Sequence, residues 1–93
     1  MKDRKYVIIS GANSGLGKSL AENFLKDGHN VLLLFRKKIN KSYFLKFKKK
    51  NKILIFYKLD LINQNEIKKF ILFLKINFKD ANVLINNAAD IGP

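Results

Sequence analysis

Cysteine is absent from this chain of 93 residues, and histidine occurs once, as His29. Without cysteine the chain forms no disulfide and offers neither a thiolate nucleophile nor a thiolate metal ligand. One histidine alone does not build a metal cluster, so we predict no metal site. His29 follows Gly28 at a predicted helix-to-strand junction, which indicates a surface turn residue.

Long hydrophobic runs are also missing. The most apolar stretches, 31–35 and 70–78, are much shorter than the roughly 20 residues that cross a bilayer. The apolar run behind the charged residues 1–5 is too short for the core of a secretory signal. Because the lack of cysteine also fits a reducing compartment, we predict a cytoplasmic protein whose residues 1–93 form one small domain.

Acidic residues are few, 7 against 19 basic ones, and the net charge is +12. Ten basic residues and no acidic one lie from Arg36 to Lys58. One interpretation is a polyanionic partner such as nucleic acid, on whose bases Tyr43, Phe44 and Phe47 would stack. We prefer the alternative, a general bias toward lysine, asparagine, isoleucine and phenylalanine, with the three rings forming the core face of a helix.

Apolar residues follow strand and helix patterns in alternation. Short continuous apolar runs predict buried parallel strands at 6–9, 31–35, 53–57 and 83–85. Apolar residues at i, i+3 and i+4 spacing predict helices at 16–27, 40–51 and 64–77. Strands that alternate with helices predict an α/β fold with a parallel sheet and right-handed crossovers.

Two of the predicted helices carry capping signals. Asn40 or Ser42 lies where the second would begin, and Asn63 precedes the third, with Glu66 three residues later as in a capping box. The inner stripe of the third helix would be Ile67, Phe70, Ile71 and Leu74. Because Phe73, Ile76 and Phe78 broaden this stripe, we expect the helix to be covered on more than one side.

The most informative segment is 10–17, Ser-Gly-Ala-Asn-Ser-Gly-Leu-Gly, between the first predicted strand and the first helix. Glycine permits a positive φ and a close approach of the backbone to a phosphate. The first N–H groups of a helix, and its dipole, attract an anion. This order of strand, glycine-rich turn and helix predicts a cradle for a dinucleotide pyrophosphate.

The glycine spacing in 10–17 resembles the T-G-x-x-x-G-x-G signature of the short-chain dehydrogenase/reductase family. Asp60-Leu61 is similar to the family's aspartate motif, which touches adenine, and 86–89 (Asn-Asn-Ala-Ala) is similar to its N-N-A-G motif. The resemblance covers the whole chain. It implies a partial Rossmann fold with a four-stranded parallel sheet in the order 3-2-1-4 and three helices.

The resemblance also implies the cofactor-binding residues. Ser10, in place of the usual threonine, would brace the loop, Asp60 would accept a hydrogen bond from the adenine amine, and Asn87 would lie beneath the nicotinamide ribose. Ala89 stands where the family has glycine, so its methyl group would crowd the cofactor or be absorbed by a small backbone shift. The full set is Ser10, Gly11, Asn13, Ser14, Gly15, Leu16, Gly17, Arg36, Lys37, Asp60, Leu61, Asn87 and Ala88.

The end of the second strand favours NADP over NAD. Proteins of such folds that use NAD place a carboxylate there to hold both ribose hydroxyls, and the matching residue here is Phe35. Arg36 follows, and a guanidinium grips a 2′-phosphate in bidentate fashion. The alternative is that Arg36, Lys37 and Lys38 are simply part of the lysine-rich surface.

The family's catalytic residues have no match in this chain. They are a serine and the tyrosine and lysine of a Y-x-x-x-K motif, whereas Tyr6, Tyr43 and Tyr57 are followed at that spacing by serine, phenylalanine and leucine. We therefore name no catalytic residue and expect the NADP-binding N-terminal half of an oxidoreductase, inactive alone. Its full enzyme would pass hydride between NADP(H) and a carbonyl or alcohol, most nearly like retinol-dehydrogenase-like members.

Two other functions remain open for such a half-domain. It could be a non-catalytic NADP-binding module, or one piece of a two-chain enzyme. The fourth strand would leave an open sheet edge, which is a template for pairing with other chains. We therefore also expect self-association.

Overall fold

The computed structural model describes residues 6–13, 15–78 and 83–86. Its strands are β1 (Tyr6–Ser10), β2 (Asn30–Phe35), β3 (Leu54–Lys58) and β4 (Val83–Asn86). Its helices are α1 (Gly15–Lys26), α2 (Lys41–Leu45) and α3 (Gln64–Asn77). All strand pairs are parallel, in the order β3-β2-β1-β4. The predicted α/β Rossmann-like fold with parallel strands and three helices is confirmed.

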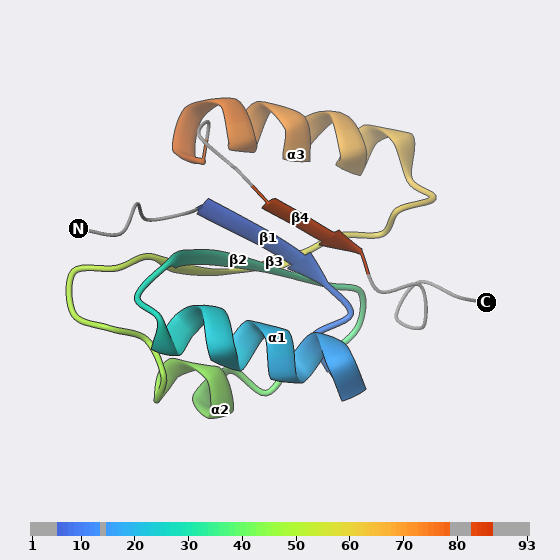
Figure 1. The fold of residues 1–93 in the computed structure, drawn as a ribbon. Coiled ribbons are helices and arrows are strands. Elements are labelled where there is room, and N and C mark those ends of the chain that lie inside the picture. Colours follow the sequence, from blue (N-terminus) through green and yellow to red (C-terminus); the bar gives the residue numbers. More distant parts are fainter. Residues whose placement is uncertain (1–5, 14, 79–82, 87–93) are drawn as a thin grey trace.

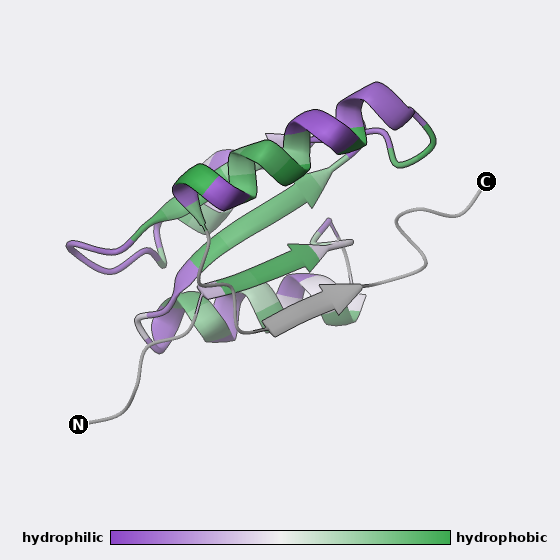
Figure 2. Ribbon diagram, turned by 90° about the horizontal axis from the view of Figure 1, so that it is seen from above, coloured by the Kyte–Doolittle hydropathy of each residue, from purple (hydrophilic) through white to green (hydrophobic). Residues whose placement is uncertain are grey.

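The sheet lies between two layers of helix (Figure 1). Helices α1 and α2 cover one face, and α3 covers the other. In the view from above, β1 and β2 are hydrophobic over most of their length, whereas the helices carry both hydrophobic and hydrophilic residues (Figure 2). No helix in the described part of the chain is long and apolar enough to cross a membrane.

The alternation of side chains along the strands separates two cores. On the α1–α2 face the fully buried residues include Val7, Ile9, Val31, Leu33, Ala21, Leu25 and Phe44. On the α3 face the buried residues are Ile8, Leu32, Leu34, Leu59, Phe70 and Phe78. Since both faces of β1 and β2 are buried, these strands are continuous apolar runs in the sequence.

The second helix is shorter than predicted. Asn40 caps it, because its side-chain oxygen accepts a hydrogen bond from the N–H of Tyr43 at 3.2 Å, but the helix ends at Leu45. The N–H of Phe47 then donates to the carbonyl of Phe44, a tighter i to i−3 bond that closes the last turn. Residues 48–50 are all lysine, so the sequence has no apolar side chains there that could extend the buried face of the helix.

Two predictions about burial are wrong. His29 is 5% exposed and packs its ring against Phe24, because Gly28, at a φ of +80°, ends α1 and leads directly into β2. Ile71 is 46% exposed, and α3 instead packs Phe70 and Phe73 against Tyr57.

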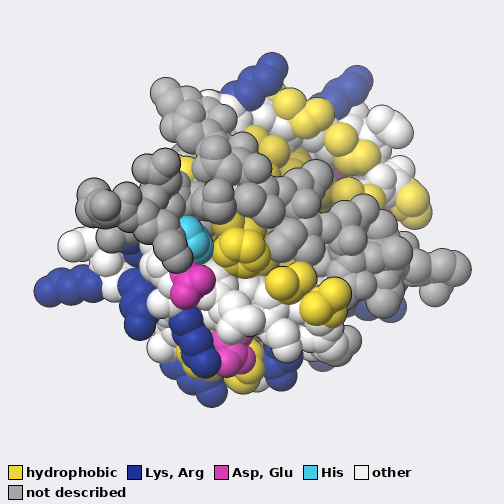
Figure 3. Space-filling model, viewed as in Figure 1, with side chains coloured by type: hydrophobic (Ala, Val, Ile, Leu, Met, Phe, Trp, Pro, Cys, Tyr) yellow, Lys and Arg dark blue, Asp and Glu magenta, His cyan; other side chains and the backbone are white. Residues whose placement is uncertain are grey.

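The outer side of α3 carries exposed apolar residues among its lysines. Leu72 and Ile76 are exposed there together with Ile71, and hydrophobic side chains reach the surface over this helix (Figure 3). The described residues therefore cover α3 on one side, not on more than one side as predicted. Self-association stays a prediction.

A polar network joins α1 to α2. The Tyr43 hydroxyl donates to one Glu22 oxygen at 2.5 Å, and the Lys26 ammonium pairs with the other at 2.7 Å. These two hydrogen bonds, that of Lys26 first, lower the pKa of Glu22, whereas the bond to Glu22 raises the pKa of Tyr43. The ammonium groups of Lys18 and Lys46 lie 4.2 and 4.5 Å from the centre of the Tyr43 ring.

The assignment of the core predicts different costs for the same substitution at two positions. Ile9→Val removes one methylene group from a side chain that is 0% exposed, so we expect the free energy of unfolding to fall by about 1 kcal/mol. Ile76→Val makes the same change where the side chain is 77% exposed, and we expect less than about 0.5 kcal/mol. Urea unfolding followed by circular dichroism measures both, and equal losses would contradict this core.

The network around Glu22 predicts a pH-dependent contribution to stability. The pKa of Glu22 in the folded state lies below its ordinary value of 4.5. The stabilisation by the ionised Glu22 is therefore complete above pH 4.5 and is lost as the pH falls through the pKa of the folded state. We expect Glu22→Gln to lower the melting temperature at neutral pH and to have a shrinking effect down to about pH 3. A melting-temperature difference that stays constant over this range would contradict the role of the carboxylate.

Candidate functional site

A cleft lies where β1, β2 and β3 end. Its lining residues are Ser10, Leu34, Phe35, Arg36, Leu59, Asp60, Leu61 and Ile62, and it encloses about 410 Å³, part of which is open to solvent. The chain leaves β1 along one face of the sheet and reaches β4 along the other. The cleft thus adjoins the point where the strand order reverses, which is the usual ligand position in open α/β sheets.

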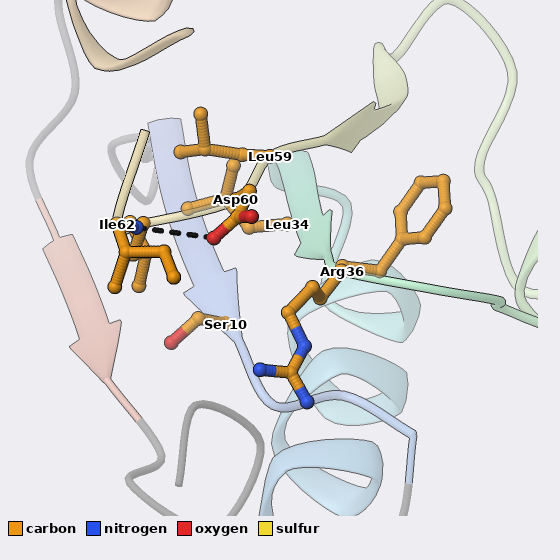
Figure 4. Close-up of a pocket in the computed structure, with 8 residues that line it drawn as sticks. Ser10, Leu34, Arg36, Leu59, Asp60 and Ile62 are labelled. Atoms are coloured by element: carbon orange, nitrogen blue, oxygen red, sulfur yellow. Dashed lines mark hydrogen bonds between the residues drawn. The ribbon is translucent and has the colours of Figure 1, made fainter. Parts of the chain in front are cut away.

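Polar groups from three strand ends meet around this cleft. Figure 4 shows Ser10 at the end of β1, the Arg36 guanidinium beyond β2 and the Asp60 carboxylate beyond β3. Ser10 is 5% exposed, whereas Arg36 is exposed. A cation and an anion at opposite sides of one cleft suit a ligand that carries a negative group at one end and a hydrogen-bond donor at the other.

Two glycines shape the turn between β1 and α1. Gly11 has a φ of +77° and Gly15 a φ of +59°. Residues with a Cβ rarely adopt these backbone conformations. At Gly15 an added Cβ would meet nothing within 4 Å, so the backbone conformation is what requires glycine there. Helix α1 begins at Gly15 with no acidic residue in its first turn, so no carboxylate offsets the positive end of its dipole.

The loop after β3 is held by three backbone hydrogen bonds. The N–H of Asp60 donates to the Glu66 carboxylate at 3.0 Å, that of Ile62 to Asp60 Oδ1 at 3.1 Å, and that of Asn63 to the Asp60 carbonyl at 3.0 Å. Within the part of the chain that the structure describes, the Leu61 N–H and Asp60 Oδ2 have no partner. The loop thus offers a donor, the Leu61 N–H, and an acceptor, Asp60 Oδ2, on neighbouring residues.

The walls of the cleft beside this pair are apolar. Leu34 and Leu59 are buried, at 8% and 5% exposure, and Ile62 is 86% exposed. An apolar slot with a donor and an acceptor on one side matches a flat heteroaromatic ring with a polar edge.

A second, shallower groove lies beside the first. Asn13 from the glycine turn lines it together with Lys37, Lys38, Ile39 and Asn40 from the segment after β2. The two lysines are exposed. This groove therefore brings an amide side chain and two positive charges close to the start of α1.

The structure brings together part of the predicted set. Ser10, Arg36, Asp60 and Leu61 share the cleft, and Asn13 shares the groove with Lys37. Leu16 is 72% exposed in the first turn of α1, and Gly17 is buried within that helix. Ser14, Asn87 and Ala88 lie outside the described residues, as does Ala89.

Sequence reasoning missed the apolar walls and the second groove. The missed lining residues are Leu34, Leu59 and Ile62 in the cleft, and Lys38, Ile39 and Asn40 in the groove. Apolar side chains that line a cleft have the same sequence pattern as apolar side chains of the core, so the pattern alone does not separate them. An isoleucine next to Asp60-Leu61, at an exposed loop position, is the signal that could have indicated a wall for a flat ring.

Comparisons with known proteins agree with this geometry. A family model described as short chain dehydrogenase matches residues 5–92. The chain is 40% identical over 90 residues to a 3-oxoacyl-[acyl-carrier-protein] reductase of Buchnera aphidicola, covering 95% of this chain and 36% of that protein. It is 30% identical over 82 residues to an NADP-dependent 3-hydroxy acid dehydrogenase of Salmonella typhi, covering 88% and 32%.

A solved structure shares the fold. A short chain dehydrogenase from Bacillus anthracis superposes with a TM-score of 0.75 at 32% identity, over 89% of this chain and 34% of that one. The chain thus spans about a third of the length of the proteins it matches. Because the family model matches residues 5–92 and the strands, glycine turn and cleft are those of a dinucleotide-binding fold, this chain belongs to the short chain dehydrogenase family.

Proposed function

We propose that this chain is the cofactor-binding part of an oxidoreductase and that it binds NADP(H) in preference to NAD(H). The observation that carries the proposal is the cleft that Arg36 and Asp60 share, with Phe35 in place of a carboxylate at the end of β2. A carboxylate at this position would accept from both ribose hydroxyls of NAD and repel a 2′-phosphate. The similarity to an NADP-dependent dehydrogenase supports the same preference.

The adenine would bind against the loop after β3. Adenine carries a donor, its amino group, beside an acceptor, the ring nitrogen N1. Asp60 Oδ2 would accept from the amino group, and the Leu61 N–H would donate to N1. The apolar side chains of Leu34, Leu59 and Ile62 would enclose the ring.

The phosphates would bind at the two positive ends of the site. The turn from Gly11 to Gly15 and the first N–H groups of α1 suit the pyrophosphate. The Arg36 guanidinium suits the 2′-phosphate, and Lys37 adds charge from the groove beside it. Ser10 would brace the turn, and Asn13, Ser14, Leu16 and Gly17 would complete the phosphate contacts, with Asn87 and Ala88 near the nicotinamide ribose.

NADP(H), when bound, supplies or takes up the hydride that is exchanged with a carbonyl or alcohol. This chain's residues would hold the cofactor but would not move the proton. The family's tyrosine needs a lysine that lowers its pKa, whereas the Tyr43 hydroxyl donates to Glu22, which raises its pKa. Tyr6 and Tyr57 lie in β1 and β3 and pack against Phe78 and Phe70, respectively. We therefore propose that the chain alone is inactive.

The two other NADP-based functions use the same site. A non-catalytic NADP-binding module and one piece of a two-chain enzyme would both bind the cofactor as described. The hypothesis of nucleic-acid binding loses its stacking residues, because Phe44 is 1% exposed and the Tyr43 and Phe47 rings pack against the core and under lysine side chains. The likeness to retinol-dehydrogenase-like members and the cytoplasmic location stay predictions.

Arg36 predicts the cofactor preference. We expect the chain to bind NADPH about tenfold or more tightly than NADH, because a charge-assisted hydrogen bond contributes about 1.5–3 kcal/mol. Arg36→Ala should remove this preference by weakening NADPH alone, and Arg36→Lys should keep part of it. Calorimetric titration of the unaltered chain and both variants with each nucleotide measures the six affinities.

Lys75→Ala is the matched control for charge. It removes one positive charge from the last turn of α3, whereas the cleft adjoins the segment before the first turn of that helix. We expect its preference for NADPH to equal that of the unaltered chain. Equal affinities of the unaltered chain for NADPH and NADH would overturn the proposed preference.

The missing proton donor predicts that binding and turnover are separate in this chain. A preparation that binds NADPH should not oxidise it when small ketones, diketones and 3-oxoacyl thioesters are added. Absorbance at the reduced nicotinamide band follows the reaction. Turnover above the rate without protein would overturn the proposed inactivity.

A further inference from the structure

Glu66 makes an unusual contact for a residue at its position. In a capping box the side chain of the third helical residue reaches back to the N–H of the cap itself. Here the N–H of the cap Asn63 donates to the Asp60 carbonyl, and the Glu66 carboxylate accepts from the N–H of Asp60 at 3.0 Å. The other half of the box is present, since the Glu66 N–H donates to Asn63 Oδ1 at 3.1 Å. Glu66 thus holds a cleft residue rather than the helix end.

This contact decides which groups of the loop remain for a ligand. The N–H of Asp60 donates to Glu66, and those of Ile62 and Asn63 donate to Asp60. The Leu61 N–H, which lies between them in the chain, has no partner among the described residues. The same arrangement uses Asp60 Oδ1 for the N–H of Ile62, so that Oδ2 remains. Figure 4 shows this carboxylate with one oxygen bonded to Ile62.

The resulting pair has a polarity that only some bases match. One donor beside one acceptor complements the amino group and N1 of adenine. Hypoxanthine presents an oxygen and an N–H at these two positions, which reverses both. A loop fixed in this conformation therefore pairs with adenine and leaves both groups unsatisfied with hypoxanthine.

We propose that Glu66 is a positioning residue that fixes the loop 60–63 and so sets a preference for adenine over bases with the reversed edge. The proposal rests on the proposed binding of NADP(H). The Glu66 carboxylate would touch neither the base nor the phosphates and would act through the backbone of Asp60. If this bond is lost, the Asp60 N–H becomes a second free donor and the loop is no longer held by α3.

The test compares NADPH with its hypoxanthine analogue, which has the same phosphates and sugars. We expect the unaltered chain to bind NADPH about tenfold or more tightly than the analogue, because the reversed base edge would leave Asp60 Oδ2 and the Leu61 N–H unpaired beneath the bound base. In Glu66→Ala this ratio should fall to about threefold or less. Calorimetry gives both dissociation constants.

Three further variants separate positioning from helix capping. Glu66→Asp keeps the negative charge in the first turn of α3 but is one methylene too short, so its ratio should also fall. Glu66→Gln keeps an acceptor oxygen and should keep most of the ratio. Asn63→Ala removes the cap bond and costs the helix about 1 kcal/mol, yet it should leave the ratio unchanged.

The outcomes distinguish this proposal from the proposed function. An unchanged ratio in the alanine and aspartate variants, or an equal fall of the ratio in Asn63→Ala, would overturn the role of Glu66. Equal binding of the two nucleotides by the unaltered chain would overturn it as well, with NADP(H) binding intact. No binding of either nucleotide would overturn both proposals.

Discussion

The parallel pairing of β1 with β2 on one side and β4 on the other is the constraint on which the site depends. The register sets Ser10 opposite Leu34 and Asn86, and Leu34 in turn opposite Tyr57. Parallel strands in this register end at the same edge of the sheet, so the segments that follow them start side by side. Burial of both faces of β1 and β2 stabilises the register, because a slip by one residue would exchange the two cores.

In the segment between β3 and α3, the hydrogen bonds within the fold determine which polar groups remain available to a ligand. A chain that passes from a strand into a helix leaves several N–H groups without partners. Asn63, Asp60 and Glu66 accept hydrogen bonds from the N–H groups of residues 60, 62, 63 and 66, whereas the Leu61 N–H has no partner among the described residues. The groups that stabilise the start of α3 are therefore the same groups that define the polar edge of the cleft.

The large positive charge has two different structural settings. Around Tyr43, lysine side chains pack over aromatic rings and pair with Glu22, and there they join α1 to α2. After β2, Arg36 and Lys37 line open concave surfaces instead. Charge that packs against the protein's own rings is less available to a polyanion, whereas charge at a cleft is placed for an anionic ligand.

The sequence by itself determined the strands, the glycine turn and the caps at Asn40 and Asn63, because each depends on the periodicity or chemistry of a few neighbouring residues. Only the tertiary structure decided that α2 ends at Leu45, that His29 is buried and that Glu66 reaches Asp60. It also decided which three strand ends share one cleft. These features depend on contacts between segments that are far apart in the sequence, and the local pattern of residues does not indicate which segments pack together.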